Sequence, residues 1–453
     1  MNVVIVGCGL VGRTVAQQLS NENVDITLID NDYQTLKTVS DTYDVMGFCG
    51  NGASYEVQVE AETSKADLLI AVTPSDEINI LCCLLAKKLG AKNTIARVRN
   101  PEYIHQLEFM KEDLGLSMSI NPEYAAAEEI MNLIRFPQAL NVQGFENGRL
   151  NMVDLLLEEG NPLIGLKLYE IYKKYNIRLL ICAVNRNKEV IIPNGDTLLC
   201  ENDVITISTT QTELEKFFEA AGIRKKVIDS AMIIGGSKIA YYLTQKLVES
   251  GVDVKIIEKD EQRCVQLCET LPSKVQIVNG HGMDEDTLDE EGMDEYDAFI
   301  ALTGVDEENT IISMYANAKG IDKVITKINK MSIFDMIKSA DMDSIVFPKL
   351  ITSNIIVSYV RAMKNSVGST VKALHKIGDR KLDALQFEIK ENAQIIGSPF
   401  KNLKFKENNV LIAGIIRNEQ VIIPDGNSSI QAGDSVIVVT HASDLHDIND
   451  ILR

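Results

Sequence analysis

One stretch decides the expected fold of this chain: VVIVGCGLVGRTVAQQLSNENVDITLIDND, from Val3 to Asp32. The apolar run at its start predicts a buried strand, the glycines after it predict a tight turn, and the next residues have the apolar spacing of a helix. A second apolar run ends at Asp30 and predicts another strand. This order of elements is typical of a parallel sheet covered by helices on both faces.

The pattern occurs twice. It returns as AMIIGGSKIAYYLTQKLVESGVDVKIIEKD, from Ala231 to Asp260, and a different block recurs as EVIIPNGDTLLCENDVITIST from Glu189 and QVIIPDGNSSIQAGDSVIVVT from Gln420. The short β-branched runs of that second block predict a small antiparallel sheet. We therefore predict an α/β chain of two tandem units, with parallel-sheet domains at 1–137 and 227–364 and smaller β-rich domains at 138–226 and 365–453.

Each parallel-sheet domain is expected to end in a helix that follows a proline, over 123–135 after Pro122 and over 351–363 after Pro348. The apolar residues of these helices have helical spacing. Two interpretations stay open at this stage: the helix packs on its own domain, or it forms a dimer contact.

Charge and composition exclude several classes of function. The net charge of −20 predicts repulsion from nucleic acids and from anionic lipid surfaces. No stretch approaches the roughly 20 apolar residues that cross a bilayer. Met1 leads directly into a strand pattern instead of a signal sequence, so we expect a cytosolic protein. Eight cysteines without C-x-x-C pairs and five dispersed histidines make a transition-metal site unexpected.

A phosphate-binding loop is the main functional prediction. Gly7-Cys8-Gly9-Leu10-Val11-Gly12 fits G-x-G-x-x-G between a strand and a helix, and Asp30 ends the next strand at the expected distance. The glycines permit a tight turn, close approach of the backbone to a pyrophosphate and close helix packing, and the helix start offers free N–H groups. An aspartate that accepts both ribose hydroxyls repels a 2′-phosphate, which favours NAD(H) or an adenine nucleotide over NADP(H).

Other residues are expected at the same edge of the sheet. Arg13 follows the last glycine, where it could clamp a phosphate or simply be solvated. Of Arg97 and Arg99, which alternate along a strand, we favour Arg97 for the ligand cleft. Thr73 lies in the loop after the fourth strand; Asp76 and Asn79 follow it, and helix N-capping explains them at least as well as a ligand does.

The second copy is altered. Its loop reads Gly235-Gly236-Ser237-Lys238-Ile239-Ala240, Glu258 keeps the acid, and Lys327 and Asn329 replace the two arginines. We expect weaker phosphate binding there.

These features together resemble the RCK (or KTN) family, which regulates potassium conductance and includes the regulators of Trk potassium uptake systems. The segments TPSDEIN from Thr73 and ARVRNPEYI from Ala96 are particularly specific, and the resemblance covers essentially the whole chain. It implies two RCK units, each with a Rossmann-like N domain and a small α+β C domain. It also implies a homotetrameric ring beneath a potassium-transporting membrane subunit of the TrkH or TrkG kind, binding NAD(H) and ATP or ADP. Its ligand positions fall on Gly7, Gly9, Gly12, Arg13, Asp30, Asn51, Thr73 and Arg97; many relatives carry Asp where this chain has Asn51.

The leading hypothesis is a cytosolic, non-enzymatic regulator in which a bound nucleotide acts as a signal. The β-rich domains offer no convincing proton donor, since their Asn and Asp residues sit in turn-like positions. The alternatives are an NAD-dependent oxidoreductase, suggested by the intact loop, and a transcription regulator, disfavoured by the acidic charge. Glu128 and Glu129 could hold a cation at an interface, although a solvated face explains them better.

Overall fold

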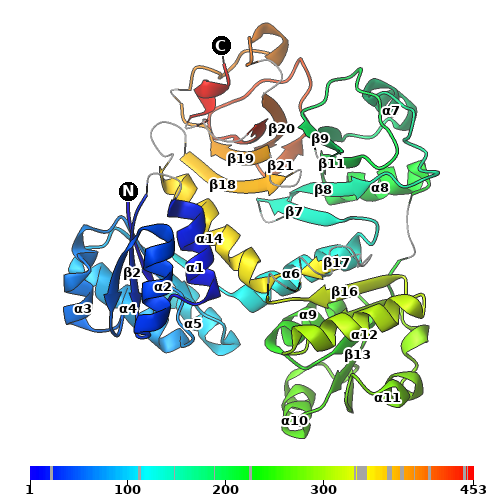
Figure 1. Cartoon of the computed structure of the whole chain (residues 1–453). Helices are drawn as coiled ribbons and strands as arrows, with labels where there is room; N and C mark the ends of the chain where they lie inside the picture. The colour runs from blue at the N-terminus through cyan, green and yellow to red at the C-terminus, as the bar shows by residue number, and fades with distance from the viewer. Residues whose placement is uncertain are drawn as a thin grey trace. The chain divides into compact units, whose positions relative to one another are not determined.

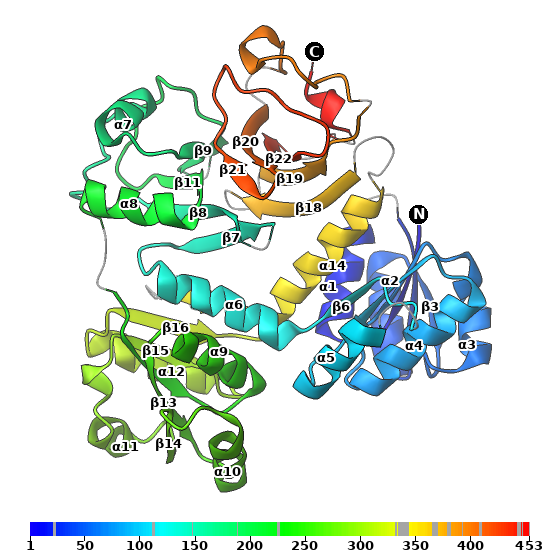
Figure 2. The same cartoon turned by 180° about the vertical axis from the view of Figure 1, so that it is seen from behind.

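A computed structural model of the chain describes residues 1–20, 24–110, 114–146, 148–187, 189–223, 227–330, 333, 344–364, 370–377, 382–391, 393–406, 410–441, 445 and 447–452 (Figures 1 and 2). The chain forms two compact units. One unit combines Met1–Met131 with Ile228–Val357, and the other combines Asn132–Val227 with Ser358–Arg453. The first unit therefore holds both N domains and the second holds both C domains.

The two N domains are six-stranded parallel sheets with the same strand order, which confirms the predicted doubly wound architecture. The first has the order β3-β2-β1-β4-β5-β6 and the second β14-β13-β12-β15-β16-β17. The strands of the first are β1 (Asn2–Val6), β2 (Asp25–Asp30), β3 (Met46–Cys49), β4 (Leu68–Ala71), β5 (Asn93–Arg97) and β6 (Met118–Ile120). Those of the second are β12 (Ser230–Ile234), β13 (Asp253–Glu258), β14 (Gln276–Asn279), β15 (Ala298–Ala301), β16 (Lys323–Lys327) and β17 (Ser344–Val346).

Helices cover both faces of each sheet (Figure 1). The first N domain has α1 (Leu10–Ser20), α2 (Tyr33–Tyr43), α3 (Tyr55–Glu60), α4 (Asp76–Leu89), α5 (Pro101–Met110) and α6 (Pro122–Arg135). The second has α9 (Lys238–Glu249), α10 (Glu261–Thr270), α11 (Glu285–Glu290), α12 (Asp306–Ala318) and α14 (Pro348–Lys364). Because β1 pairs with β2 on one side and β4 on the other, the chain reverses direction across the sheet at β1. The loop after β1 lies at this switch point, where such sheets bind ligands.

The C domains are small antiparallel sheets, as predicted, and they too share one strand order. The first, in the order β10-β9-β11-β8-β7, contains β7 (Asn141–Phe145), β8 (Leu150–Leu156), β9 (Leu180–Arg186), β10 (Glu189–Ile191) and β11 (Val204–Thr209), with helices α7 (Leu168–Tyr175) and α8 (Gln211–Ala221). The second, in the order β18-β19-β22-β20-β21, contains β18 (Thr370–Ile377), β19 (Leu382–Glu388), β20 (Val410–Arg417), β21 (Gln420–Ile422) and β22 (Ser435–His441).

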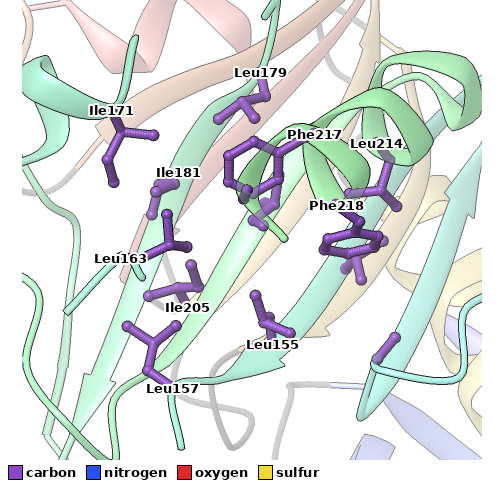
Figure 3. Packing of buried hydrophobic residues seen from close by; sticks show 14 of the residues in the cluster. Leu155, Leu157, Leu163, Ile171, Leu179, Ile181, Ile205, Leu214, Phe217 and Phe218 are labelled. Atoms are coloured by element: carbon purple, nitrogen blue, oxygen red, sulfur yellow. The ribbon is translucent and has the colours of Figure 1, made fainter. Parts of the chain in front are cut away.

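Each face of the first C sheet has its own apolar cluster. On one face, Leu214, Phe217 and Phe218 of α8 pack with Ile171 of α7 over buried strand residues such as Ile205 (Figure 3). On the other face, Phe145, Leu150, Met152 and Cys182 form a single cluster with residues of the second C domain, among them Ala413, Ile437 and Val439. The two C domains therefore share a core, and Ser208 Oγ donates a buried hydrogen bond of 2.9 Å to Ala413 O across it.

The helices that end the N domains answer the question left open by the sequence. Helix α6 contacts α9 of the second N domain: Asn121, just before α6, donates from Nδ2 to the Tyr242 hydroxyl at 3.0 Å, and Glu128 forms an ion pair with Lys246. In return, Ser353 of α14 donates to Val11 O of α1 at 3.5 Å. Each of the two helices therefore contacts the other N domain of the same chain, and we call α6 and α14 the exchanged helices.

The predicted domain boundaries stay predictions. The boundaries after residues 226 and 364 fall beside 224–226 and 365–369, which lie outside the described residues. Across the described ranges, no helix has the length and apolar character needed to cross a membrane.

The shared C-domain core makes a prediction about Gly414. A Cβ at this position would lie 2.6 Å from Leu150 Cδ2, so Gly414→Val should overpack the interface and lower the free energy of unfolding by about 1–3 kcal/mol. Chemical denaturation of the full chain measures this. Leu150→Ala in the same background should recover part of the loss, and Gly195→Ala, whose nearest neighbour would be Tyr169 Cβ at 3.8 Å, should be nearly neutral. Additive losses for the Gly414 and Leu150 substitutions would contradict the predicted clash.

Candidate functional site

The loop between β1 and α1 is shaped by two close approaches. Gly7 has a φ of 104°, and a Cβ there would lie 3.0 Å from Thr73 N. A Cβ on Gly12 would collide with Gly7 O. These two glycines are therefore required by the fold itself.

Gly9 differs from its two neighbours in the motif. Its φ lies outside the positive range, and a Cβ there would meet no described atom within 4 Å beyond the adjacent residues. The fold gives no reason for glycine at this position. The G-x-G-x-x-G motif would place a pyrophosphate beside this glycine, and the open space above Gly9 leaves room for it.

Asp30 holds the loop in place. Its Oδ2 accepts from Cys8 N at 2.5 Å and its Oδ1 accepts from Asp32 N at 2.8 Å. Each carboxylate oxygen has a second lone pair, so the side chain can still accept from ribose hydroxyls. The structure thus brings Asp30 to the loop as predicted and adds a bracing role that the motif alone did not indicate.

Arg13 lies over the loop. Its Nε donates to Cys8 O at 3.0 Å, which leaves the two terminal nitrogens of the guanidinium for an anion. The neighbouring motif residues contribute little through their side chains: Cys8 and Val11 are buried, and only Leu10 is exposed. Burial, with a smaller contribution from Asp30, raises the pKa of the Cys8 thiol to about 12.

Asn51 and Thr73 lie in the loops after β3 and β4, at the same edge of the sheet. Asn51 Oδ1 accepts from Ala53 N at 3.0 Å, so its Nδ2 hydrogens are the groups left for a ligand. Thr73 donates from both N and Oγ1 to Asn79 Oδ1 at 2.8 Å. Thr73 O accepts from Arg97 Nη2 at 2.6 Å.

Arg97 lies beneath the Thr73 loop and is half-buried, and burial lowers the pKa of its guanidinium. Its Nε is buried and has no hydrogen-bond partner among the described residues. Nearby, Glu123 Oε2 is likewise buried without such a partner, and burial raises the pKa of this carboxyl group.

The N-capping interpretation of Asp76 and Asn79 is wrong. Ser75 is the N-cap residue of α4, with its side chain accepting from Ile78 N at 3.2 Å. Asp76 is buried and accepts from the backbone amides of Arg99 and Asn100 at 2.8 Å each. Asn79 donates to Thr73 O and Arg97 O, at 3.1 and 2.9 Å. Through these hydrogen bonds, both residues hold the ends of β4 and β5 and the loops after them in place.

Arg99 is the residue whose role was underestimated. It pairs with Asp76, donates to Pro74 O, and its own carbonyl accepts from the hydroxyl of Tyr242 at 3.3 Å. Tyr242 belongs to α9 of the second N domain. Arg99 therefore connects the loop after β4 with the other N domain, a role that spacing along one strand did not reveal.

Glu258 repeats the geometry of Asp30. Its Oε2 accepts from Gly236 N at 2.5 Å and its Oε1 from Asp260 N at 2.8 Å. Lys327 and Asn329 make contacts comparable to those of Arg97 and Arg99. Lys327 Nζ donates to Leu302 O at 3.3 Å, and Asn329 Nδ2 donates to Asp306 Oδ1. The second site therefore keeps the frame of the first.

Glu128 and Glu129, the two carboxylates considered for a cation at an interface, differ in their surroundings. Glu128 pairs with Lys246, which also explains why this face is not simply solvated. Burial raises the pKa of Glu129 to about 7. Within the described ranges, no three His, Cys, Asp or Glu side chains cluster as metal ligands would.

Comparison with known proteins agrees with this architecture. The family model of the TrkA-N domain matches residues 3–122 and 231–348, and that of the TrkA-C domain matches 152–222 and 384–453. The chain is 31% identical over 452 residues to the Trk system potassium uptake protein TrkA homolog 1 of Methanosarcina mazei, covering 98% of each chain. It is 30% identical to the Trk system potassium uptake protein TrkA of Haemophilus influenzae, covering 100% of this chain and 98% of the other.

Solved structures share the fold. The GsuK channel bound to NAD matches with a TM-score of 0.64 at 16% identity, covering 97% of this chain and 77% of the other. The GsuK RCK domain matches with a TM-score of 0.63 at 16% identity, covering 97% and 92%.

The loop geometry predicts that Gly9 and Gly12 differ in their effect on stability. Gly12→Ala should lower the free energy of unfolding by about 1–3 kcal/mol, because its Cβ collides with Gly7 O. Gly9→Ala should stay within about 0.5 kcal/mol of the wild type. Denaturant unfolding of both variants checks this, and equal losses would contradict the assignment of Gly9 to a ligand.

The raised pKa of Cys8 predicts low reactivity. Since the thiolate is the nucleophile and a pKa of about 12 leaves the thiol protonated at pH 8, Cys8 should resist iodoacetamide at that pH in the folded protein. The exposed Cys49 and Cys268 should react and serve as internal controls. Mass spectrometric mapping measures the labelling; alkylation of Cys8 at the rate of Cys49 would disprove the burial.

Proposed function

This chain belongs to the family of proteins built from TrkA-N and TrkA-C domains, and we propose that it is a nucleotide-sensing regulatory subunit that gates a Trk-type potassium uptake channel or transporter. The observation that carries the proposal is the first glycine loop, where a Cβ on Gly9 would meet no described atom within 4 Å beyond the adjacent residues and Asp30 accepts from Cys8 N. Two relatives of similar length are potassium uptake proteins, and this is why we propose potassium uptake as the regulated process.

The proposed ligands are NAD(H) and ATP or ADP. Asp30 accepts from two backbone amides, and its carboxylate would repel the 2′-phosphate that distinguishes NADP(H). Arg13 offers two guanidinium nitrogens toward the phosphates. A structural neighbour, the GsuK channel, has been solved bound to NAD, which supports this class of ligand.

We propose that the bound nucleotide is a signal and not a reagent. The contacts described around the glycine loop brace backbone groups, which favours regulation over catalysis. A nucleotide changes a conformational equilibrium only if it binds the two states with unequal affinity; a tenfold preference is about 1.4 kcal/mol.

A route for such a change is present inside the N-domain pair. The loop after β4 bonds to Arg99 through Pro74 O, and Arg99 O accepts from Tyr242 at the exchanged-helix junction. A ligand that moves Pro74 would therefore also move Arg99, whose carbonyl oxygen accepts from the buried Tyr242 of the other N domain. We propose that this junction transmits the nucleotide state to a homotetrameric ring and from there to a potassium-transporting membrane subunit of the TrkH or TrkG kind, at the inner face of the cell membrane. The net charge of −20 argues against nucleic acid as a partner.

The test is nucleotide titration of the purified full chain. Asp30→Ala should weaken NADH and ATP binding by about 10- to 100-fold, because a charged acceptor of ribose hydroxyls is lost. Gly9→Ala should weaken binding while the fold persists. The matched control is Asp25→Ala, an exposed aspartate at the opposite end of the same strand. Isothermal titration calorimetry gives the affinities.

Potassium flux through the reconstituted partner tests the regulatory step. Flux should respond to added nucleotide with the wild-type subunit and lose that response with Asp30→Ala. Flux that is indifferent to ATP, ADP and NADH would refute gating. Steady oxidation of NADH with small carbonyl substrates would instead support the oxidoreductase alternative.

A further inference from the structure

The two N domains meet at two junctions that are related by the duplication (Figures 1 and 2). Helix α6 of the first N domain contacts α9 of the second, and the start of α14 contacts α1. The repeats align without gaps from Val3 and Ala231, and again from Pro122 and Pro348, over these four helices. Each position of the α6–α9 junction therefore has a counterpart in the α14–α1 junction.

Lys246 of α9 lies at the centre of the α6–α9 junction. Its Nζ forms an ion pair with Glu128, donates to the Tyr124 hydroxyl at 3.0 Å and lies 4.4 Å from the centre of the Tyr124 ring. Tyr124 meets the ring of Tyr242 edge to face, with the ring centres 5.6 Å apart. Tyr242 is buried, and its hydroxyl accepts from Asn121 Nδ2 at 3.0 Å. Aromatic contacts, a charge pair and hydrogen bonds therefore hold this junction together.

The α14–α1 junction has different side chains at the counterpart positions. Thr14 and Gln18 stand in place of Tyr242 and Lys246, and Leu350 and Asn354 stand in place of Tyr124 and Glu128. Thr14 Oγ1 donates to Leu10 O of its own helix at 2.8 Å, and Asn354 is exposed. Ser353 Oγ donates to Val11 O across the junction at 3.5 Å, which is long for a hydrogen bond. The charge pair and the edge-to-face ring contact of the other junction cannot form with these side chains.

The exchanged helices also differ in how firmly their first turns are built. Helix α6 has three alanines at 125–127, and alanine has the highest helix propensity. Helix α14 has Ile, Thr and Ser at the counterpart positions 351–353. The hydroxyls of Thr352 and Ser353 each donate to the backbone carbonyl four residues earlier, at 2.8 and 2.9 Å. Such bonds weaken and bend helices, so the first turns of α14 deform more easily than those of α6.

We propose that the N-domain pair pivots on the α6–α9 junction and opens at the α14–α1 junction. The α6–α9 junction bonds to Arg99 O through Tyr242, so it carries a movement of the loop after β4 to the second N domain. The α14–α1 junction permits that movement, because its contacts are fewer in kind and its helix start deforms. Helix α1 begins at Leu10, directly after Gly9 of the first glycine loop, so the opening takes place beside that loop. The inference deepens the proposed function by locating the nucleotide-dependent change, and its regulatory meaning rests on that function.

Hydrogen–deuterium exchange of the full chain without nucleotide tests the difference between the two junctions. Backbone amides of α1 and of residues 348–357 should be less protected, by about fivefold or more, than those at the counterpart positions of α9 and α6. Protection factors corrected for local sequence are compared position by position. Equal protection at the two junctions, or lower protection in α6 and α9, would overturn the proposal.

A transplanted charge pair provides the matched variant. Gln18→Lys with Asn354→Glu copies the pair of Lys246 and Glu128 into the α14–α1 junction, and it should slow exchange in α1 and in residues 348–357 severalfold while α6 and α9 stay unchanged. Gln18→Lys alone is the control, because it adds the cation without the transplanted carboxylate, and it should exchange as the wild type does.

If the double variant does not melt cooperatively, Lys246→Gln takes its place. This substitution removes the charge pair of the α6–α9 junction and should raise exchange in α6 and α9 toward the level of the other junction. Exchange that stays unchanged in the folded double variant, or in Lys246→Gln, would overturn the proposal.

Addition of nucleotide separates this inference from the proposed function. With NADH or ATP bound, exchange should change more in α1 and in residues 348–357 than in α6 and α9. A change confined to α6 and α9 would overturn the inference and leave nucleotide sensing intact. A chain that binds neither NADH nor ATP would refute the proposed function, whereas the difference in protection measured without nucleotide would still stand.

Discussion

In each N domain, a carboxylate at the end of the second strand accepts a hydrogen bond from the amide of the residue that follows the first glycine of the loop. The rest of the loop geometry depends on this bond. It occurs as Asp30 to Cys8 and again as Glu258 to Gly236, each at 2.5 Å. The same carboxylate also accepts from the amide two residues further along the chain. One side chain thus ties the glycine loop to the end of the second strand in each N domain. The same constraint persists in both copies, although the glycine motif does not.

The sequence could predict whatever is encoded locally. The two parallel sheets and the two small antiparallel sheets follow from short patterns that repeat along the chain, and the structure confirms them. Asp76 and Asn79 could not be assigned, because each has a backbone partner far along the chain: Arg99 N lies 23 residues from Asp76, and Arg97 O lies 18 residues from Asn79. Arg263, which donates from Nε to Gly236 O in the second N domain at 2.6 Å, was missed for a related reason. The guanidinium that reaches the loop carbonyl comes from α1 in the first copy and from α10 in the second. An alignment of the two repeats therefore does not pair the two arginines.

The N domains and the C domains are joined by different means. The C domains share an apolar cluster with contributions from both sheets, which is expected to resist relative movement. The N domains meet through exchanged helices whose described contacts include polar pairs, such as Asn121 with Tyr242 and Glu128 with Lys246. Polar contacts with discrete partners can be exchanged for others at modest cost, so the N-domain pair is the better place for a ligand-dependent change.

The exchanged helices also bear on how such a protein can diverge. In a dimer of identical chains, any residue at the start of the exchanged helix must appear on both sides of the symmetry axis. Here the two positions lie on one polypeptide, and Glu123 of α6 corresponds to Lys349 of α14, since each follows the first proline of its helix. Because of the tandem duplication, the residue at each of these positions no longer has to be compatible with an identical residue on the other side of the junction. A single point mutation in the gene can alter one crevice while the other keeps its chemistry, which no symmetric pair of subunits can achieve.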